Sequence, residues 1–238
     1  MARPQGFRGV LISPAVEKPD VVLTDFNNEP FNLRLKTAGK VTLLFFGYTH
    51  CPDVCPLHAA NIAAVLKQMP FEERDQIVFV FVTTDPARDT PTRLKEWLGN
   101  FEPSFVGLSG PMAEVNRLQA GLNMAPAQLD APANSATYLV AHSAQVLAFG
   151  QDSYARVEYP FGIRQEDWAQ DLPRLARGEV PQAPPVSALA ANAASGAPNA
   201  PATQPVDVAV ALIPQPVSTS EAAFYVVPAA ARSCAATR

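Results

Sequence analysis

The chain has 238 residues, a formal net charge of -4 at pH 7 and three cysteines. Its Lys and Arg residues are few and scattered, so we expect neither nucleic acid nor an anionic membrane surface as a partner. The sequence contains no apolar stretch of about eighteen residues, and the apolar run 10–12 is too short for a signal peptide. We therefore expect the chain as written to be soluble.

Composition divides the chain near residue 178. The first part mixes apolar runs with charged and aromatic residues, so it can bury an ordinary core. From Glu179 onward Ala, Pro, Val and Ser dominate, which is typical of disordered segments. We therefore expect three parts: an N-terminal extension at 1–20, a folded domain at 21–178 and a low-complexity, disordered tail at 179–238.

The first predicted elements are a hairpin and two buried strands. Residues 27–30 are rich in turn formers and join the stretches Val21–Leu23 and Phe31–Leu33 into an N-terminal β-hairpin. The unbroken apolar runs Val41–Phe46 and Ile77–Val82 are typical of parallel strands that are covered on both faces. Between these strands, apolar residues at helical spacing predict a helix that carries Leu57, Ile62, Val65, Leu66 and Met69 on one face.

The second half of the domain alternates helices and strands. In chain order we predict a helix at Thr92–Phe101, a strand at Phe105–Leu108, a helix at Met112–Leu122, an antiparallel hairpin of Ala136–Ala141 with Gln145–Phe149, and a helix at Gln165–Arg177. This order indicates an α/β fold with a central mixed sheet flanked by helices, and a thioredoxin-like arrangement fits it best.

The segment FFGYTHCPDVCP, at Phe45–Pro56, places two cysteines between the first buried strand and its helix. Cys51 and Cys55 are four residues apart, so a helical turn brings both sulfurs to one face. A helix N-terminus favours thiolates, which both metal binding and disulfide exchange require. The three intervening residues give a wider bite than the two-residue spacing of thioredoxin-type reductases, which favours a metal. The prolines and polar residues predict a surface loop, and the alternative is two small core residues.

Two further segments complete a pattern that resembles the Sco/SenC family of thioredoxin-fold copper proteins. VTTDPARDTP, at Val82–Pro91, resembles the acidic turn of that family, and ATYLVAHS, at Ala136–Ser143, resembles the strand that ends in its ligand histidine. YPFG, at Tyr159–Gly162, extends the likeness, which runs from about residue 21 to residue 177. Three motifs in the same order make the resemblance specific.

The resemblance implies a ligand set, a partner and a place of action. Cys51, Cys55 and His142 would bind copper, with His142 following Cys55 by 87 residues as is usual in the family. Two thiolates with one imidazole suit Cu(I), and they tolerate Cu(II) if a further ligand or water is added. The implied partner is subunit II of cytochrome c oxidase, whose binuclear copper site these proteins help to metallate, with other copper chaperones as further partners. The implied place of action is the periplasmic face of the inner membrane.

The chain departs from the family pattern in two ways. Family members usually carry an Asp immediately before the ligand histidine, whereas this chain has Ala141, so we expect an acceptor near the imidazole to be missing. Family members also normally begin with a membrane anchor or a lipoprotein signal, and we find neither pattern here. Cys234 lies alone in the tail, where it could dimerise the protein or be incidental.

Other polar residues near the motif have two interpretations each. We expect His50 and His58 to face solvent, although either could approach a metal. Asp53 lies between the cysteines and Asp85 follows the second buried strand, so both could influence the charge of a bound ion. For Asp85, an alternative of equal weight is turn chemistry in the Asp-Pro sequence that leads to Pro91.

The sequence leaves two functions in competition. The first is a metallochaperone that holds copper and passes it on by ligand exchange. The second is a thiol-disulfide oxidoreductase, an enzyme that would reduce the copper-ligating cysteines of the partner, with Cys51 as the attacking thiolate. His142 discriminates between them, because a reductase has no need of a distant imidazole. A peroxidase of the peroxiredoxin kind is disfavoured, because the Thr-x-x-Cys arrangement is missing.

Overall fold

A computed structural model describes residues 6–132 and 137–182 of the chain. Residues 183–238 of the predicted tail, which include Cys234, lie outside these residues. Among the residues described, no helix is both long and apolar enough to cross a membrane.

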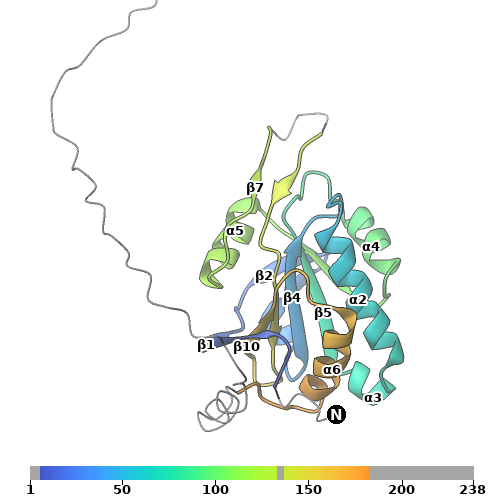
Figure 1. Cartoon of the computed structure of the whole chain (residues 1–238). Coiled ribbons are helices and arrows are strands. Elements are labelled where there is room, and N and C mark those ends of the chain that lie inside the picture. Colours follow the sequence, from blue (N-terminus) through green and yellow to red (C-terminus); the bar gives the residue numbers. More distant parts are fainter. Residues whose placement is uncertain (1–5, 133–136, 183–238) are drawn as a thin grey trace, which may run out of the picture. The chain divides into compact units, whose positions relative to one another are not determined.

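In the part of the chain that the structure describes, eight strands form the main sheet in the order β1-β10-β9-β4-β5-β6-β2-β3. Strands β4 and β5 lie side by side within it (Figure 1). The strands are β1 (Val10–Glu17), β2 (Val22–Asp25), β3 (Pro30–Asn32), β4 (Val41–Gly47), β5 (Ile77–Thr83), β6 (Val106–Ser109), β9 (Val146–Phe149) and β10 (Tyr154–Tyr159). Strands β4, β5 and β6 are parallel, and β9 is antiparallel to β4. The sheet is therefore mixed, as predicted.

Helices cover both faces of this sheet. They are α1 (Leu33–Lys36), α2 (Val54–Gln68), α3 (Phe71–Arg74), α4 (Pro91–Gly99), α5 (Met112–Gly121) and α6 (Gln165–Ala176). Helices α2, α4 and α6 contribute to one core cluster together with one set of β4 side chains, whereas α1 and α5 contribute to a second cluster with the alternate set. Because both of its faces are covered, every residue of β4 is buried, which accounts for its unbroken apolar sequence.

The α/β class, the flanking helices and the N-terminal hairpin are confirmed. Strands β2 and β3 pair antiparallel and β3 leads directly into α1. The predicted buried strands correspond to β4 and β5, and the predicted helices to α2, α4, α5 and α6, with ends that differ by a few residues. The prediction that Leu57 lies on the apolar face of its helix is wrong, because Leu57 is 44% exposed and lies off the buried face of α2.

The predicted hairpin around His142 is wrong. β8 (Val140–Ala141) pairs with β7 (Gln128–Leu129) in a separate two-stranded sheet, whereas β9 pairs with β10. Strands β10 and β1 were not predicted, although β10 alternates buried and less buried residues, as a strand with one face toward the core does. β1 lies within residues 1–20 and pairs antiparallel with β10 at the sheet edge, where most of its side chains are exposed and give little hydrophobic signal.

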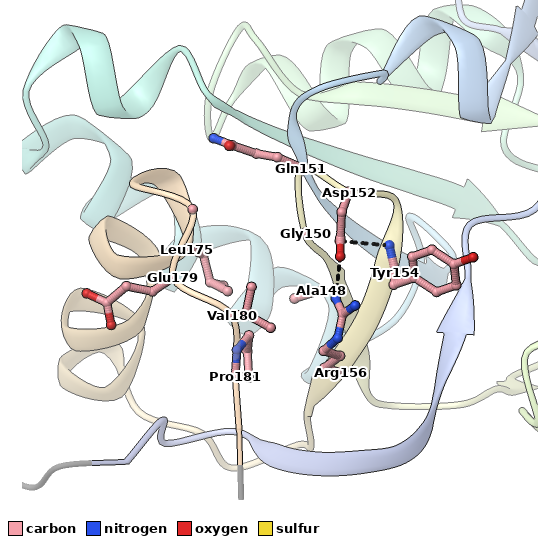
Figure 2. A pocket seen from close by; sticks show the side chains of 11 residues that line it. Ala148, Gly150, Gln151, Asp152, Tyr154, Arg156, Leu175, Glu179, Val180 and Pro181 are labelled. Carbon is pink, nitrogen blue, oxygen red and sulfur yellow. Dashed lines mark hydrogen bonds and ion pairs between the residues drawn. The ribbon is translucent and has the colours of Figure 1, made fainter.

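A small pocket lies beside the β9–β10 hairpin (Figure 2). Its volume is about 170 Å³, and its walls include Tyr154, Leu175 and the ion pair of Arg156 with Asp152, whose atoms are 2.8 Å apart. The pocket is at the end of β9 that pairs with the beginning of β4, at Thr42. The cysteine loop follows the other end of β4, so this pocket is remote from the cysteines.

Lys18 is a charged residue in the interior, with 0% exposure. Its Nζ donates to the hydroxyls of Thr37 and Thr42, at 3.0 and 2.9 Å, and to the Thr37 carbonyl at 3.1 Å. Burial lowers the pKa of this amine from 10.5 to about 8, and the nearby Asp152 opposes the effect only in part. The folded protein therefore releases the Lys18 proton at a lower pH than the unfolded chain does.

This difference predicts a pH-dependent stability. Between pH 8 and pH 10.5 the unfolded chain keeps a proton that the folded protein has lost, so the free energy of unfolding rises with pH across this window. Relative to Lys18→Met, the wild-type protein should gain on the order of 3 kcal/mol over the window. Urea denaturation of both proteins from pH 7 to pH 10 measures the difference, and parallel pH profiles would contradict the prediction.

Candidate metal centre

The cysteine loop joins the end of β4 to the beginning of α2. The Cys51 N–H donates to the Tyr48 carbonyl at 3.2 Å, which closes a tight turn. Asp53 caps α2, with its side chain accepting from the Val54 N–H at 2.6 Å. Cys55 follows in the first turn of the helix, so the prediction that the cysteines lie where strand becomes helix is confirmed.

Gly47, the last residue of β4, gives Cys55 its place. A Cβ atom at position 47 would lie 2.6 Å from the Cys55 Sγ, closer than real Cβ contacts come, and 3.0 Å from the Phe81 ring, which is tighter than most of them. The Cys55 sulfur therefore occupies the space that the side chain of any other residue at position 47 would fill. This close approach of sheet and helix accounts for a glycine at the end of an otherwise bulky strand.

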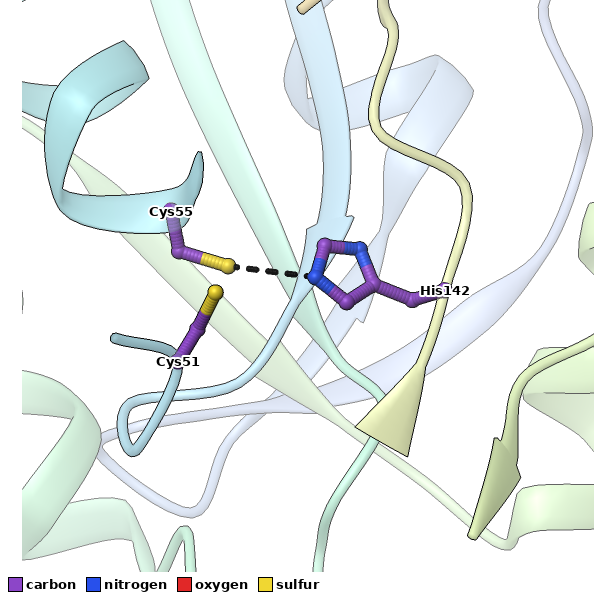
Figure 3. A group of neighbouring side chains, drawn as sticks. All are labelled: Cys51, Cys55 and His142. Atoms are coloured by element: carbon purple, nitrogen blue, oxygen red, sulfur yellow. Dashed lines mark hydrogen bonds between the residues drawn. The ribbon is translucent and has the colours of Figure 1, made fainter. Parts of the chain in front are cut away.

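The structure brings together the three residues that the sequence singled out (Figure 3). The Cys55 Sγ lies 3.5 Å from the His142 Nε2, and one donor atom from each of Cys51, Cys55 and His142 falls within 4.8 Å of the other two. His142 follows β8, which lies outside the main sheet. Two segments far apart in the sequence thus converge on one point.

The two sulfurs are less accessible than the sequence predicted. Cys51 is 9% exposed and Cys55 is 0% exposed, so the expectation of a surface loop is wrong for the cysteines themselves. The polar and proline residues Pro52 and Asp53 are exposed, but the chain turns so that both cysteine side chains join the main core cluster. An imidazole also lies beside this buried pair, a contact that packing of two small core residues does not by itself require.

The two thiols have opposite acid–base character. A hydrogen bond from the Cys55 thiol lowers the pKa of Cys51 to about 3, because its effect exceeds the opposing effect of burial, and smaller contributions from His142 and from backbone N–H groups act in the same direction. Burial raises the pKa of Cys55, and the adjacent Cys51 sulfur raises it further. Copper-free protein at neutral pH therefore holds a Cys51 thiolate and a Cys55 thiol.

The His142 ring is held by both of its nitrogens and by aromatic contacts. Its Nδ1 lies 3.0 Å from the Ser143 carbonyl, and we assign the ring proton to Nδ1, which donates to this oxygen. In this tautomer Nε2 carries a lone pair, which points toward the two sulfurs. The rings of Phe45 and Tyr48 meet the imidazole at steep angles, with centroids 5.9 and 5.6 Å away. Ala141 is exposed, and the Ser143 carbonyl supplies the acceptor that we expected to be missing.

His58 does not face solvent, contrary to expectation. It is 2% exposed, and its Nε2 bonds the Ala144 carbonyl at 3.0 Å, so it ties α2 to the segment of His142. Its ring packs against Phe45 and Trp168. The buried residues of α2 include positions 55, 58, 59, 62 and 66, a spacing that already placed His58 on the buried face. His50, by contrast, is exposed as predicted.

Asp85 behaves as a turn residue, while Asp53 is an exposed helix cap. The Asp85 carbonyl accepts the N–H groups of Arg88 and Asp89, and its buried carboxylate pairs with Arg88 and with the Tyr138 hydroxyl, 2.7 Å away. Sequence reasoning treated the segment around Asp85 as one turn. It missed the contacts of Arg88 and Asp89 with the two ligand-bearing segments, because these contacts depend on tertiary structure.

Residues 14–177 match the model of the SCO1/SenC family. The chain belongs to this family. Sco proteins form a family of cytochrome c oxidase assembly proteins. A candidate copper-binding protein of Stutzerimonas stutzeri is 33% identical over 161 residues, covering 68% of this chain and 78% of that protein. Mitochondrial Sco2 of Saccharomyces cerevisiae is 41% identical over 93 residues, covering 39% of this chain and 31% of the yeast protein.

A solved structure gives the same fold. Bradyrhizobium japonicum ScoI with copper bound is 34% identical to this chain, with a TM-score of 0.59 over 68% of this chain and 99% of that structure. The thioredoxin-like fold that the element order predicted is therefore confirmed, and the alignment spans essentially the whole of the ScoI structure.

Burial of His58 predicts a loss of stability at acid pH. Burial lowers its pKa, so as the pH falls below about 6.5 the unfolded chain takes up a proton that the folded protein resists. The free energy of unfolding of the wild type should therefore decrease more between pH 7.5 and pH 5 than that of His58→Gln. Urea denaturation across this range measures the difference.

His50→Gln is the matched control, because it removes an exposed imidazole from the neighbouring loop. It should keep the wild-type dependence on pH. An equally steep acid loss in His58→Gln would show that other groups are responsible.

Proposed function

We propose that Cys51, Cys55 and His142 bind copper, and that the protein carries copper to the binuclear site of cytochrome c oxidase subunit II. The observation that carries the proposal is the meeting of two sulfurs and one imidazole nitrogen within 4.8 Å, from segments 87 residues apart. A core cysteine pair alone would not require the histidine.

The chemistry of this donor set fits copper better than a hard cation. Thiolate sulfur and imidazole are the ligands that Cu(I) prefers, whereas Mg²⁺ and Ca²⁺ prefer oxygen. Cys51 is already a thiolate in the copper-free protein, and Cys55 must lose its proton when the metal binds. Uptake of copper should therefore release a proton chiefly from Cys55.

The same arrangement suits release of the ion. Three protein ligands do not fill the coordination shell of Cu(II), so water or a ligand of the partner can add without any bond breaking first. His142 is only half-buried, whereas Cys55 is fully covered, so the imidazole side is the accessible side of the site. Copper would leave by exchanging His142 first and the thiolates last.

Known members of the family support copper as the cargo. ScoI of Bradyrhizobium japonicum has been solved with copper bound, and it aligns with this chain over 99% of its length. By family resemblance we place the activity at the periplasmic face of the inner membrane, with other copper chaperones as further partners. The working unit would be the folded domain predicted at residues 21–178 together with β1 of the predicted extension at 1–20, which pairs with β10 in the main sheet, and it would precede the proposed tail at 179–238.

A second candidate function is thiol-disulfide exchange, favoured by the lowered pKa of Cys51. The Cys51 thiolate would attack a disulfide of the partner, forming a mixed disulfide and releasing one partner thiolate. Cys55 would then lose its proton, attack the Cys51 sulfur and release the second partner thiolate. The partner gains two electrons, and this chain ends with a Cys51–Cys55 disulfide. His142 has no required part in this sequence of steps.

Replacement of His142 separates the two functions. His142→Ala should abolish the visible absorption of the thiolate–Cu(II) complex, because two sulfurs alone leave the site underfilled. The rate at which the reduced variant exchanges with oxidised glutathione should stay near that of the wild type. Anaerobic copper titration followed by absorption spectroscopy, beside a stopped-flow exchange assay, measures both. Unchanged copper binding by His142→Ala would refute the ligand set.

The oxidation state of the cysteines should control uptake. Disulfide sulfur is a poor ligand, so protein oxidised to the Cys51–Cys55 disulfide should bind no stoichiometric copper, and reduction should restore binding. Copper can be counted by metal analysis after gel filtration of oxidised, reduced and re-reduced samples. One equivalent of copper retained by the oxidised sample would contradict the proposal.

A further inference from the structure

The segment that carries His142 needs an anchor outside the main sheet. It follows β8, which pairs with β7, and three residues separate His142 from β9, which pairs with β4, so the main sheet fixes the segment on only one side of His142. His58 also holds the Ala144 carbonyl after the histidine, so the separation of 3.5 Å between the Cys55 Sγ and the His142 Nε2 depends further on side chains that hold the segment before it. The turn between β5 and α4, residues 84–90, supplies them.

One end of this turn holds the cysteine loop. The buried Asp89 accepts the Thr49 N–H at 2.9 Å, the Thr49 hydroxyl at 2.6 Å and the Thr83 hydroxyl at 2.6 Å. Thr49 lies two residues before Cys51. The donor atoms of His50, Asp85 and Asp89 also fall within 4.8 Å of one another, but the bonds just described occupy the Asp89 oxygens, so this cluster serves a structural role.

The middle of the same turn holds the histidine segment. The Arg88 guanidinium lies 3.5 Å from the centroid of the Tyr138 ring, and its Nη1 donates to the Tyr138 carbonyl at 3.1 Å. Its Nε pairs with the buried Asp85 carboxylate, which also accepts the Tyr138 hydroxyl. Tyr138 precedes His142 by four residues. Arg88 thus contacts the ring and the backbone of the histidine segment and is itself held by the turn.

A second path leads from Arg88 toward the imidazole. The guanidinium lies 5.8 Å from the centroid of the Tyr48 ring, and Tyr48 meets the His142 ring edge to face. A planar guanidinium can lie flat on an aromatic ring while its N–H groups donate in fixed directions within its plane, whereas a lysine ammonium is a compact charge with no flat face. The contacts at this position therefore require arginine.

We propose that Arg88 is a positioning residue for His142, and that it sets the reach of the imidazole to the two sulfurs. This inference rests on the proposed copper ligands, and it adds a residue that touches neither the two sulfurs nor the imidazole ring of His142. Asp89 fixes the turn to the cysteine loop, and Arg88 fixes the histidine segment to the turn. Loss of Arg88 should free the imidazole and leave the cysteine pair in place.

The test compares Arg88→Met with Arg93→Met. Arg93, in α4, donates to the Thr49 hydroxyl at 3.1 Å and so contacts the cysteine side only. Arg88→Met should weaken Cu(II) affinity by about 10- to 100-fold, as is typical when a residue that supports a ligand is lost. It should also lose the imidazole nitrogen coupling in the electron paramagnetic resonance spectrum. Arg93→Met should keep that coupling, and both variants should keep the wild-type rate of disulfide exchange.

A copper-free measurement separates this inference from the proposed function. In the reduced wild type, the rings of Phe45 and Tyr48 should shift the ring-proton resonances of His142. Arg88→Met should move these resonances toward those of an unstructured histidine, and Arg88→Lys should do the same. If the wild type bound no copper, the proposed function would fail, yet this shift would still decide the role of Arg88.

Two outcomes would overturn the inference. One is an Arg88→Met protein whose His142 resonances and nitrogen coupling match those of the wild type. The other is loss of disulfide exchange together with copper binding in a folded Arg88→Met protein, which would mean general damage to the site. If Arg88→Met does not fold, Tyr138→Phe removes only the hydroxyl bond to Asp85 and should give a smaller shift in the same direction.

Discussion

The approach of the Cys55 sulfur to the His142 imidazole is the contact on which the rest of the site depends. Their separation of 3.5 Å joins the first turn of α2 to a segment outside the main sheet. Each side is fixed by its own means. Gly47 admits the sulfur at the end of β4, while His58 and Arg88 hold the backbone on either side of His142, at Ala144 and at Tyr138.

The order of rigidity follows from these anchors. The cysteines belong to the largest core cluster, and β4 behind them is buried along its whole length. The histidine segment lies between the two-residue pairing of β8 with β7 and the beginning of β9, and no residue of it belongs to the main sheet, so it should open at a lower free energy than the cysteine loop. A site with two fixed ligands and one less firmly held ligand can capture an ion and still give it up.

The sequence predicted those parts of the structure that depend on local patterns. The unbroken apolar runs gave β4 and β5, the spacing of the cysteines placed them at the beginning of α2, and the three ordered motifs led to His142. The hairpin assigned around His142 was wrong because alternation reveals a strand but not its partner, and β8 pairs with β7. β1 was missed because an exposed edge strand has little apolar contrast.

The polar residues around the site show a different limit. His58 looked like a solvent-facing residue because it is polar, yet its position among the buried residues of α2 argued for the interior. A buried histidine needs a partner, and its partner, the Ala144 carbonyl, lies 86 residues away in the sequence. The same holds for Arg88 and Tyr138, 50 residues apart. No local pattern identifies such pairs, because they exist only after the sheet has formed.

The difference in acidity between the two cysteines links the two candidate functions. A thiolate at Cys51 beside a thiol at Cys55 is the state from which disulfide exchange begins, and it is also the state into which a soft cation can bind while displacing one proton. What distinguishes the chain from a simple dithiol is the histidine and the residues that hold it in place. A protein that only exchanged disulfides would have little need of His58, Arg88 and Asp85 acting together on the backbone around His142, because Cys55 and not His142 contributes most to the lowered pKa of Cys51. The imidazole side of the site therefore argues for copper, and the sulfur side alone would not.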